Sequence, residues 1–355
     1  MRAPSSGPSA TTETILNASI VTTCLPSDEV SPWQSSFDGH VDLLYSLMKE
    51  QCILPFEKKG GGPISPSSLR DGKVRIFNSA IFCNDKFNGS TAVQHVTEQL
   101  FLMQALTASL STIRTREELE TAWGTPGFTS QMLLLENADA LVDIGTSFLR
   151  VWGVHTIGLT HVGRNRLADG NTTVNPEGLT KACQTLLPNL ETRGFVIDIA
   201  HLAEVCFWEL LDSFHGHLCC SHTGLRHFCD TPRNLGDDQI SVLLSRNGVI
   251  GLSFAPEMLS TSGKSDCRQV FEQIDYLVQR WGSRGFALGS DLGGYETNCS
   301  GLESHAQLEN LVELMVQAGY PKTEIDALLG GNWFEFYLEA LPNGLNGHPE
   351  NESSA

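Results

Sequence analysis

The sequence predicts a single-domain (β/α)8 barrel of the TIM type, with an active site at the C-terminal ends of its strands. Eight short apolar segments alternate with amphipathic segments along most of the chain. The length of 355 residues suits one large α/β barrel. A doubly wound open sheet is the alternative, but no glycine-rich phosphate turn follows the first predicted strand, which weakens its dinucleotide-binding version.

The predicted strands are short runs of apolar and β-branched residues that end in polar ones. The clearest of them is the segment Gly-Phe-Val-Ile-Asp-Ile-Ala-His at residues 194–201. In order, the strands are the segment ending at His40–Asp42 and residues 73–83, 132–136, 156–161, 194–201, 217–222, 248–253 and 285–291.

The predicted helices show apolar residues at spacings of three and four. They cover residues 43–48, 90–116, 138–151, 177–193, 203–214, 237–246, 266–281, 304–317 and 322–329. Residues 55–68 contain a Gly-Gly-Gly-Pro run and are predicted to be a loop at the rim.

We expect the barrel to occupy residues 13–342. Residues 1–12 are rich in Pro, Ser, Gly and Thr and are predicted to be a disordered tail, and the polar residues 343–355 a second tail. The N-terminal residues lack the apolar segment of a secretory signal, and no apolar run reaches membrane-spanning length. These features predict a cytoplasmic protein with no membrane partner.

Composition narrows the classes of function. The formal net charge of −18 repels phosphate backbones, so we expect no nucleic-acid partner. The ten cysteines form no CxxC pair and are predicted to be small buried side chains rather than a disulfide scaffold.

Candidate metal ligands lie at the carboxyl ends of the predicted strands, where barrels of this kind place their chemistry. Taken singly, each has an ordinary explanation as a helix cap or a buried core histidine. Their joint placement at one end of the strand layer indicates a site. The residues are His40 and Asp42, Glu136, His161, His201, His222 and Asp291.

This set exceeds what one zinc ion needs and fits a site for two divalent ions. Glu136 would bridge the ions, His40 and Asp42 would hold one of them, and the other would be held by His201 and His222. The ions would share a water molecule and lower its pKa from about 15.7 toward 7. Asp291 is placed to carry the proton to the leaving amine.

Ordered motifs along the chain add a family resemblance. They are Asp38-Gly-His-Val-Asp42, Leu159-Thr-His161 with Asn165 and Ala168-Asp169, Ile197-Asp-Ile-Ala-His201, Ser221-His222 with Pro232-Arg-Asn-Leu235, Gly289-Ser-Asp-Leu-Gly293 and Gly330-Gly-Asn332. With these motifs the chain resembles the renal, or membrane, dipeptidases, a family of binuclear zinc peptidases related to the amidohydrolase barrels.

The resemblance implies the same metal-ligand assignment and adds two substrate residues. His161 resembles the histidine that polarises the scissile carbonyl and stabilises its oxyanion. Arg233 resembles the arginine that receives the free carboxylate of the dipeptide. Asp291 resembles the proton-handling aspartate. The implied metal is zinc, although manganese, cobalt or iron tolerate the same nitrogen and oxygen ligands.

Three positions depart from the family pattern without removing a ligand. Val41 replaces the asparagine usual between the first His and Asp, Asn137 stands where glycine follows the bridging glutamate, and Gly170 replaces an asparagine. The resemblance implies a microbial-type or fungal member and a homodimer. One fungal branch, the gliotoxin-pathway dipeptidases, trims glycine from Cys-Gly groups of a glutathione-derived intermediate in secondary metabolism, so such conjugates are candidate substrates.

Two other functions stay open from the sequence. An amidohydrolase of the same build would act on another amide, lactone or lactam, and would turn over simple dipeptides poorly while binding metal well. A catalytically silent barrel would serve as a binding protein, and would hold no stoichiometric metal.

Overall fold

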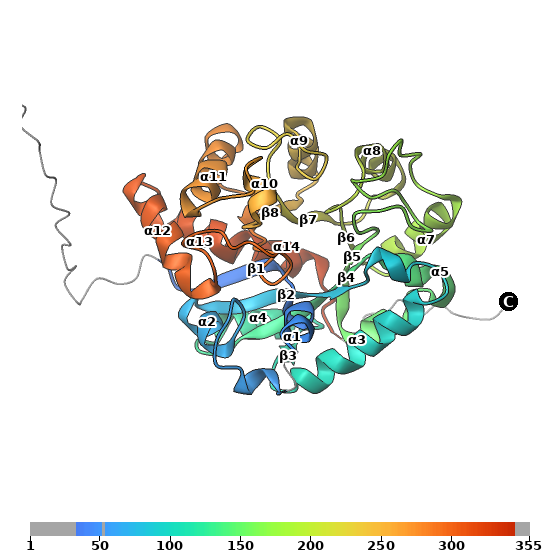
Figure 1. The fold of residues 1–355 in the computed structure, drawn as a ribbon, viewed down its shortest axis with the longest axis horizontal. Coiled ribbons are helices and arrows are strands. Elements are labelled where there is room, and N and C mark those ends of the chain that lie inside the picture. Colours follow the sequence, from blue (N-terminus) through green and yellow to red (C-terminus); the bar gives the residue numbers. More distant parts are fainter. Residues whose placement is uncertain (1–32, 52–53, 345–355) are drawn as a thin grey trace, which may run out of the picture. The chain divides into compact units, whose positions relative to one another are not determined.

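A computed structural model describes residues 33–51 and 54–344. Its strands form one parallel sheet that closes on itself, and helices surround that sheet (Figure 1). The (β/α)8 barrel predicted from the sequence is thereby confirmed. The described residues belong to one compact unit that begins at residue 32. The predicted tail at 1–12 and nearly all of the one at 343–355 lie outside the described residues.

Eight strands close the barrel, because β2 pairs with both β1 and β4 and β9 pairs with β1. The short β3 pairs only with β4, at the edge of the ring. The strands are β1 (Ser36–Val41), β2 (Val74–Phe82), β3 (Ser111–Thr112), β4 (Ser130–Glu136), β5 (Val154–Gly158), β6 (Val196–Asp198), β7 (Leu218–Thr223), β8 (Val249–Leu252) and β9 (Phe286–Leu288).

Most α-helices lie between successive strands in the chain and surround the barrel, whereas α12, α13 and α14 follow the last strand (Figure 1). The α-helices are α1 (Leu43–Lys49), α2 (Pro66–Asp71), α3 (Ala92–Leu106), α4 (Arg116–Gly124), α5 (Leu141–Ile144), α6 (Ser147–Trp152), α7 (Lys181–Thr192), α8 (Glu204–Ser213), α9 (Asp237–Ser245), α10 (Pro256–Leu259), α11 (Cys267–Trp281), α12 (Leu308–Gln317), α13 (Lys322–Asp326) and α14 (Asn332–Ala340).

Several predicted boundaries were wrong. The helix expected at 90–116 ends at Leu106, because β3 and a new capping box at Thr115 intervene before α4 begins. The helix expected at 138–151 is divided at Gly145, whose φ of 63° ends α5. Helix α2 occupies part of the loop predicted at 55–68.

Helix α14 was not predicted, and it closes the end of the barrel where the strands begin. Its side chains Trp333, Phe336 and Tyr337 are buried against Phe37 of β1. A Cβ atom on Gly330, just before this helix, would lie 2.3 Å from the amide nitrogen of Phe37. The missing side chain therefore lets the helix approach the first strand closely.

The barrel core thus has two parts. Inside, at the N-terminal end of the strands, one apolar residue from most strands contacts the aromatic side chains of α14. Outside, a larger apolar cluster fills the space between the sheet and the helices. Phe37 and Tyr337 stack with ring centroids 5.6 Å apart, and such aromatic contacts add to the stabilisation that burial provides.

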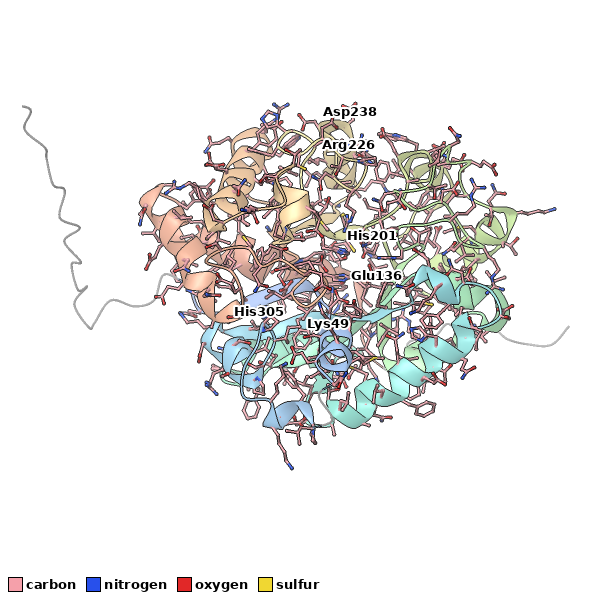
Figure 2. All side chains as sticks on the ribbon, in the orientation of Figure 1. Lys49, Glu136, His201, Arg226, Asp238 and His305 are labelled. Carbon is pink, nitrogen blue, oxygen red and sulfur yellow. The ribbon has the colours of Figure 1, made fainter. Side chains whose placement is uncertain are left out.

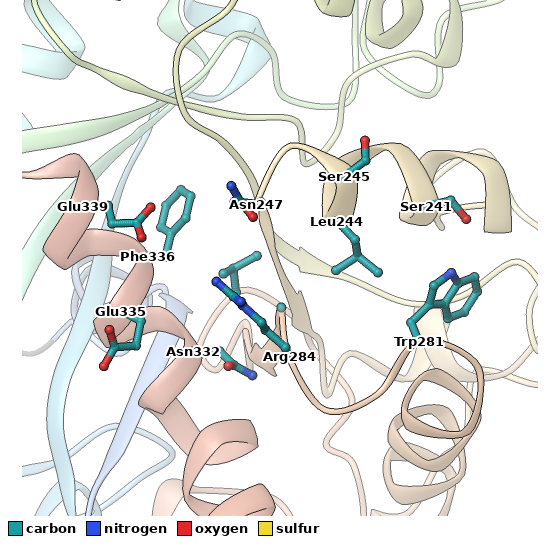
Figure 3. Close-up of a pocket in the computed structure, with 13 residues that line it drawn as sticks. Ser241, Leu244, Ser245, Asn247, Trp281, Arg284, Asn332, Glu335, Phe336 and Glu339 are labelled. Carbon is teal, nitrogen blue, oxygen red and sulfur yellow. The ribbon is translucent and has the colours of Figure 1, made fainter.

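A cavity of about 780 Å³ opens beside this closed end, between α9, α14 and the starts of β8 and β9 (Figure 3). Trp281, Leu244 and Phe336 supply apolar walls, and Arg284, Glu335 and Glu339 supply charge. None of the candidate metal ligands lines it. Within the described ranges, no helix has the length and apolar character needed to cross a membrane.

Candidate active site

The predicted ligands converge at the carboxyl ends of the barrel strands. Figure 2 shows Glu136 and His201 next to each other in the middle of the molecule, although 65 positions separate them in the sequence. Glu136 is the last residue of β4, and His201 follows β6. Their side chains meet with Nε2 of His201 3.0 Å from Oε1 of Glu136.

One group of ligands surrounds His40. Its Nε2 lies 3.5 Å from Oδ2 of Asp42 and 3.6 Å from Oε2 of Glu136. Asp42 follows β1 as the residue before α1, and a register irregularity between Asp38 and Val41 accompanies this approach. His40, Asp42 and Glu136 can place one ligand atom each within 4.8 Å of one another.

Two further groups share residues with the first. His40, His222 and Asp291 can likewise bring ligand atoms within 4.8 Å, and so can Glu136, His161 and His201. Nε2 of His201 lies 3.0 Å from Nε2 of His222. Glu136 therefore belongs to both sides of the cluster, as a bridging carboxylate would.

Left-handed backbone marks the ends of three strands at this site. Asn137, His201 and Asp291 have φ values of 70°, 63° and 61°. Side chains with a Cβ rarely adopt this conformation, and such strain is found mainly where function requires a particular side-chain direction. The backbone cost is compensated by the rest of the fold.

Glycine permits the closest approach of the loop after β9. A Cβ atom on Gly294 would lie 2.3 Å from Oδ1 of Asp291 and 2.5 Å from Oδ2 of Asp42. Any side chain there would collide with these two carboxylates. Gly294 therefore allows the loop to pass directly over them.

The residues that orient the histidines were not predicted. Ser221 donates a hydrogen bond of 2.5 Å to Oδ2 of the buried Asp198, while its Oγ lies 3.0 Å from Nδ1 of His40 and 2.8 Å from Nδ1 of His222. A hydroxyl has only one hydrogen, so both rings donate from Nδ1. Their Nε2 atoms then face the cluster, which is the arrangement that metal-binding histidines require.

The sequence alone indicates little about the orienting role of Asp198 and Ser221, because an Asp or Ser within an apolar strand can equally be interpreted as a helix cap. Asp38 is similar. It accepts hydrogen bonds from His305 Nε2 and Ser290 N at 2.8 Å each and thereby connects β1 to the loop after β9.

Carboxylates dominate the electrostatics around His40. Burial disfavours a charged His40, but the close contact with the Asp42 carboxylate and the charges of Glu136 and Asp291 outweigh it and raise the pKa of His40 to about 10. Burial alone would raise the pKa of Glu136, yet His201 and His40 hold it well below its usual range. A divalent ion would compete with the proton on His40 for the same negative charge.

Burial is the main cause of the pKa shifts of the other candidate ligands. Burial, with Arg233 nearby, lowers the pKa of His201 to about 3 and lowers that of His222 well below its ordinary value. Neutral imidazole is the form that binds metal. Burial, and then the charge of the neighbouring Asp42, raise the pKa of Asp291 well above its ordinary value.

His161 and Arg233 lie at the edge of the cluster. The His161 side chain is 20% exposed, against 1% for His40, and its ring centroid lies 4.8 Å from that of His201. Nη2 of Arg233 donates to the carbonyl oxygen of His222 at 2.9 Å and lies 3.5 Å from Nε2 of His201. The Nε atom of Arg233 is buried without a hydrogen-bond partner in the described part of the chain.

The three departures from the family pattern have local explanations. Asn137 tolerates its left-handed backbone, and its amide joins Cys83, Asn88 and Asn165 in one hydrogen-bonded network. Val41 is buried in the outer core. A Cβ on Gly170 would lie 2.2 Å from the carbonyl oxygen of His161, so this loop packs too tightly for a side chain.

These donors fit divalent metal ions. Imidazole nitrogens and carboxylate oxygens are the ligands that zinc and related ions prefer. Nε2 of His40 is buried, lacks a hydrogen-bond partner among the described residues, and faces two carboxylates. Such an atom is costly to bury unless a cation or proton occupies the space beside it.

Comparisons with known proteins identify relatives of this chain. The chain is 25% identical over 322 residues to human dipeptidase 3, covering 85% of this chain and 64% of that protein. It is 26% identical over 216 residues to dipeptidase aclJ of Aspergillus oryzae, covering 58% of this chain and 50% of that protein. An uncharacterized Klebsiella pneumoniae protein from the pqqA 5′ region is 31% identical over 160 residues, 44% of this chain and 59% of its own.

The chain therefore spans between 50% and 64% of the length of these curated relatives.

Solved structures show the same fold. A metallopeptidase from Rhodobacter sphaeroides, solved with a phosphinate mimic of L-Ala-D-Ala, has a TM-score of 0.77 at 21% identity, covering 86% of this chain and 99% of that one. The dipeptidase AC structure has a TM-score of 0.78 at 22% identity, with coverages of 87% and 99%.

The model of one family matches residues 28–340, which is most of the chain and includes every candidate ligand. On this match the chain belongs to the membrane dipeptidase family, peptidase family M19.

Proposed function

We propose that this protein is a metal-dependent dipeptidase that hydrolyses the peptide bond of dipeptides with a free C-terminal carboxylate. The observation that carries the proposal is the convergence of His40, Asp42, Glu136, His201 and His222 around shared Nε2 and carboxylate contacts at one end of the barrel. Membership of the dipeptidase family supports the reaction class.

The residues would hold two divalent ions, with zinc favoured by the donor set. His40 and Asp42 would bind one ion, His201 and His222 the other, and Glu136 both. When bound, the ions supply Lewis acidity and bring the pKa of water toward neutrality. Ser221 contacts Nδ1 of both His40 and His222, which would leave each Nε2 to hold an ion.

Asp291 would manage the proton of the reaction. Its carboxyl lies within reach of His40 and Asp42, and burial with the charge of Asp42 raises its pKa, which favours a carboxyl that can hold a proton. We infer that it accepts a proton during attack on the carbonyl carbon and delivers it to the leaving amine.

Arg233 would bind the carboxylate of the substrate. Its Nη2 is anchored on the His222 carbonyl next to His201, while the buried Nε is free of hydrogen bonds within the described residues. A guanidinium with donors to spare beside the metal ligands suits a planar carboxylate. His161 would contact the scissile carbonyl oxygen from the more exposed side.

The substrate class is proposed to include Cys-Gly groups of glutathione-derived conjugates. Two fungal proteins described as dipeptidases, from Aspergillus oryzae and Claviceps purpurea, are among the relatives. Tyr45, which is exposed, lies edge-on to Phe82, and Phe82 to His161, so an apolar wall borders the site. Such a wall suits a bulky or apolar substrate side chain.

The test combines metal analysis with kinetics on a dipeptide panel that includes Cys-Gly and its S-conjugates. Arg233→Ala is expected to raise KM about 10- to 100-fold, since a charged hydrogen-bonded contact to the carboxylate is lost, while metal content stays at the wild-type level. Arg268→Ala, which removes an exposed arginine of α11, is the matched control.

Three outcomes would redirect the proposal. Unchanged dipeptide kinetics in Arg233→Ala would remove the carboxylate contact from it. Full metal loading with poor turnover of every dipeptide would favour an amidohydrolase acting on another amide or lactam. Absence of stoichiometric metal under all loading conditions would favour a binding barrel. Cytoplasmic location and a homodimer stay predictions, and sedimentation of the pure protein tests the dimer.

A further inference from the structure

One carboxylate at the site has no role in the function proposed above. Asp85 lies in the short 3-10 helix that follows β2 (Asp85–Phe87), opposite the loop that carries His161. Its Oδ2 atom lies 3.1 Å from Nδ1 of His161 and accepts a hydrogen bond of 3.2 Å from the backbone nitrogen of Gly163. Its Oδ1 atom is buried and has no hydrogen-bond partner among the described residues.

The contact determines how the His161 ring is oriented. A carboxylate near neutral pH only accepts hydrogen bonds, so Nδ1 of His161 carries a hydrogen. Nε2 is then the nitrogen that remains for the site, where His161 can bring a ligand atom within 4.8 Å of atoms from Glu136 and His201. Phe82 packs edge-on against the His161 ring, with 4.7 Å between the ring centroids, and limits the rotation of the imidazole.

His161 differs from the buried histidines of the cluster in how it is held. His40 and His222 share Ser221, a fully buried hydroxyl, whereas His161 is held by a partly exposed carboxylate whose side chain is 27% exposed. The greater exposure of His161 suits contact with a substrate, and a carboxylate partner on Nδ1 fixes the direction of a histidine ring whether the ring binds substrate or metal.

We propose that Asp85 is a positioning residue for hydrolysis: its Oδ2 atom accepts from His161 Nδ1 and holds the ring with Nε2 toward the scissile carbonyl oxygen. This inference rests on the proposed dipeptidase function. It assigns to Asp85 a task that neither its sequence context nor the family motifs indicated.

The geometry offers a sharp pair of variants. In Asp85→Asn, the Gly163 N–H selects the amide orientation, because it needs an oxygen at the position of Oδ2. That same oxygen then accepts from His161 Nδ1, so the ring orientation is kept. Asp85→Ala removes the acceptor for both donors.

The experiment measures kcat, KM and metal content on a dipeptide that the wild type hydrolyses. Asp85→Ala is expected to lower kcat about 10- to 100-fold with a smaller change in KM and full metal content. Asp85→Asn is expected to recover most of that loss. In a His161→Ala background, Asp85→Ala is expected to cause no further loss, because the residue acts through the ring.

An activity-independent readout uses histidine-selective ¹⁵N labelling of the metal-loaded protein. The His161 signals are assigned as those that disappear in His161→Ala. In the wild type they are expected to show a protonated Nδ1. Asp85→Ala should change the protonation or the hydrogen bonding of this nitrogen, and Asp85→Asn should restore the wild-type signal.

The results separate the two proposals. A wild-type enzyme that hydrolyses no dipeptide overturns the proposed function. An active wild type with unchanged kcat in Asp85→Ala overturns the role of Asp85 alone. An equal loss with and without His161 also overturns it, since Asp85 would then act only by holding the Gly163 backbone.

Discussion

The two ends of the barrel differ in almost every physical property, although the same strands build both. On β1, Phe37 packs with Tyr337 and Trp333 at the N-terminal end, and three residues later His40 lies among carboxylates at the C-terminal end. The first end stabilises the fold through apolar burial. The second concentrates buried charge and strained backbone, which stability alone would not favour.

Two buried histidines show the contrast most directly. His40 at the active end is surrounded by carboxylates, which overcome burial and raise its pKa to about 10. His155 lies near the start of β5, where burial and then the positive charge of Arg150 lower its pKa to about 3. The same side chain is thus prepared for a cation at one end and kept neutral at the other.

The largest expected effect comes from the active end. Glu136→Gln keeps the shape of the side chain but removes the charge that would offset the repulsion between the two cations of the proposed site. We expect kcat to fall at least about 1,000-fold and metal content to drop. Kinetics with elemental analysis measure both, and Glu313→Gln on the exposed face of α12 is the control. Wild-type metal content together with wild-type kcat would contradict the bridging assignment.

At the closed end, Trp333→Ala is expected to lower the free energy of unfolding by about 3–5 kcal/mol, because it leaves a cavity and removes the bond from its Nε1 to Leu288 O. Urea unfolding measures the change. The protein that remains folded should keep its metal and its kcat. A loss of metal affinity as large as the loss of stability would show that the two ends are not separate.

Acidification should lower the stability of the fold in part through His155, which lies outside the cluster of candidate ligands. The unfolded chain takes up a proton below pH 6.5, whereas the folded chain does not until about pH 3, so stability is lost as the pH falls through that window. Between pH 7 and pH 5, His155 is expected to lower the free energy of unfolding by about 2 kcal/mol. His155→Gln is expected to flatten the pH dependence of urea unfolding by this amount. If the free energy of unfolding of the variant changed with pH as steeply as that of the wild type, His155 would be ruled out as a source of the pH dependence.

The smallest effect tests the polar contacts of the closed end. The Tyr337 hydroxyl accepts a hydrogen bond of 2.8 Å from Asn78 and lies 2.8 Å from the hydroxyl of Thr156. Tyr337→Phe removes these bonds but keeps the ring, so the free energy of unfolding should fall by about 1 kcal/mol with kcat unchanged. A loss comparable to that of Trp333→Ala would mean that hydrogen bonds, rather than ring packing, stabilise this end.

Local patterns were enough to predict most of the fold. The eight barrel strands follow from apolar runs, and the candidate ligands His40, Glu136 and His222 stand where those runs stop, at the carboxyl ends of the strands. Helix boundaries were less predictable, because caps such as Thr115 and the left-handed Gly145 interrupt stretches whose apolar spacing continues. The sequence did not predict helix α14, because its aromatic side chains are packed against residues of strands that lie far away in the chain.

The orienting residues were beyond the reach of sequence patterns. Asp85 and His161 are 76 residues apart, and Ser221 connects to His40 across 181 residues. Nothing in the local sequence distinguishes such an Asp or Ser from a helix cap or a turn. Only closure of the sheet brings these side chains within hydrogen-bonding distance.

The sequence by itself determined the element types, the barrel and the chemical identity of the donors, since these depend on periodicity and side-chain chemistry within short stretches. The tertiary structure decided which nitrogen of each histidine faces the site, which carboxylate is shared, and which end of the barrel carries charge. Those properties depend on distances of about 3 Å between residues far apart in the chain, which only the folded backbone sets.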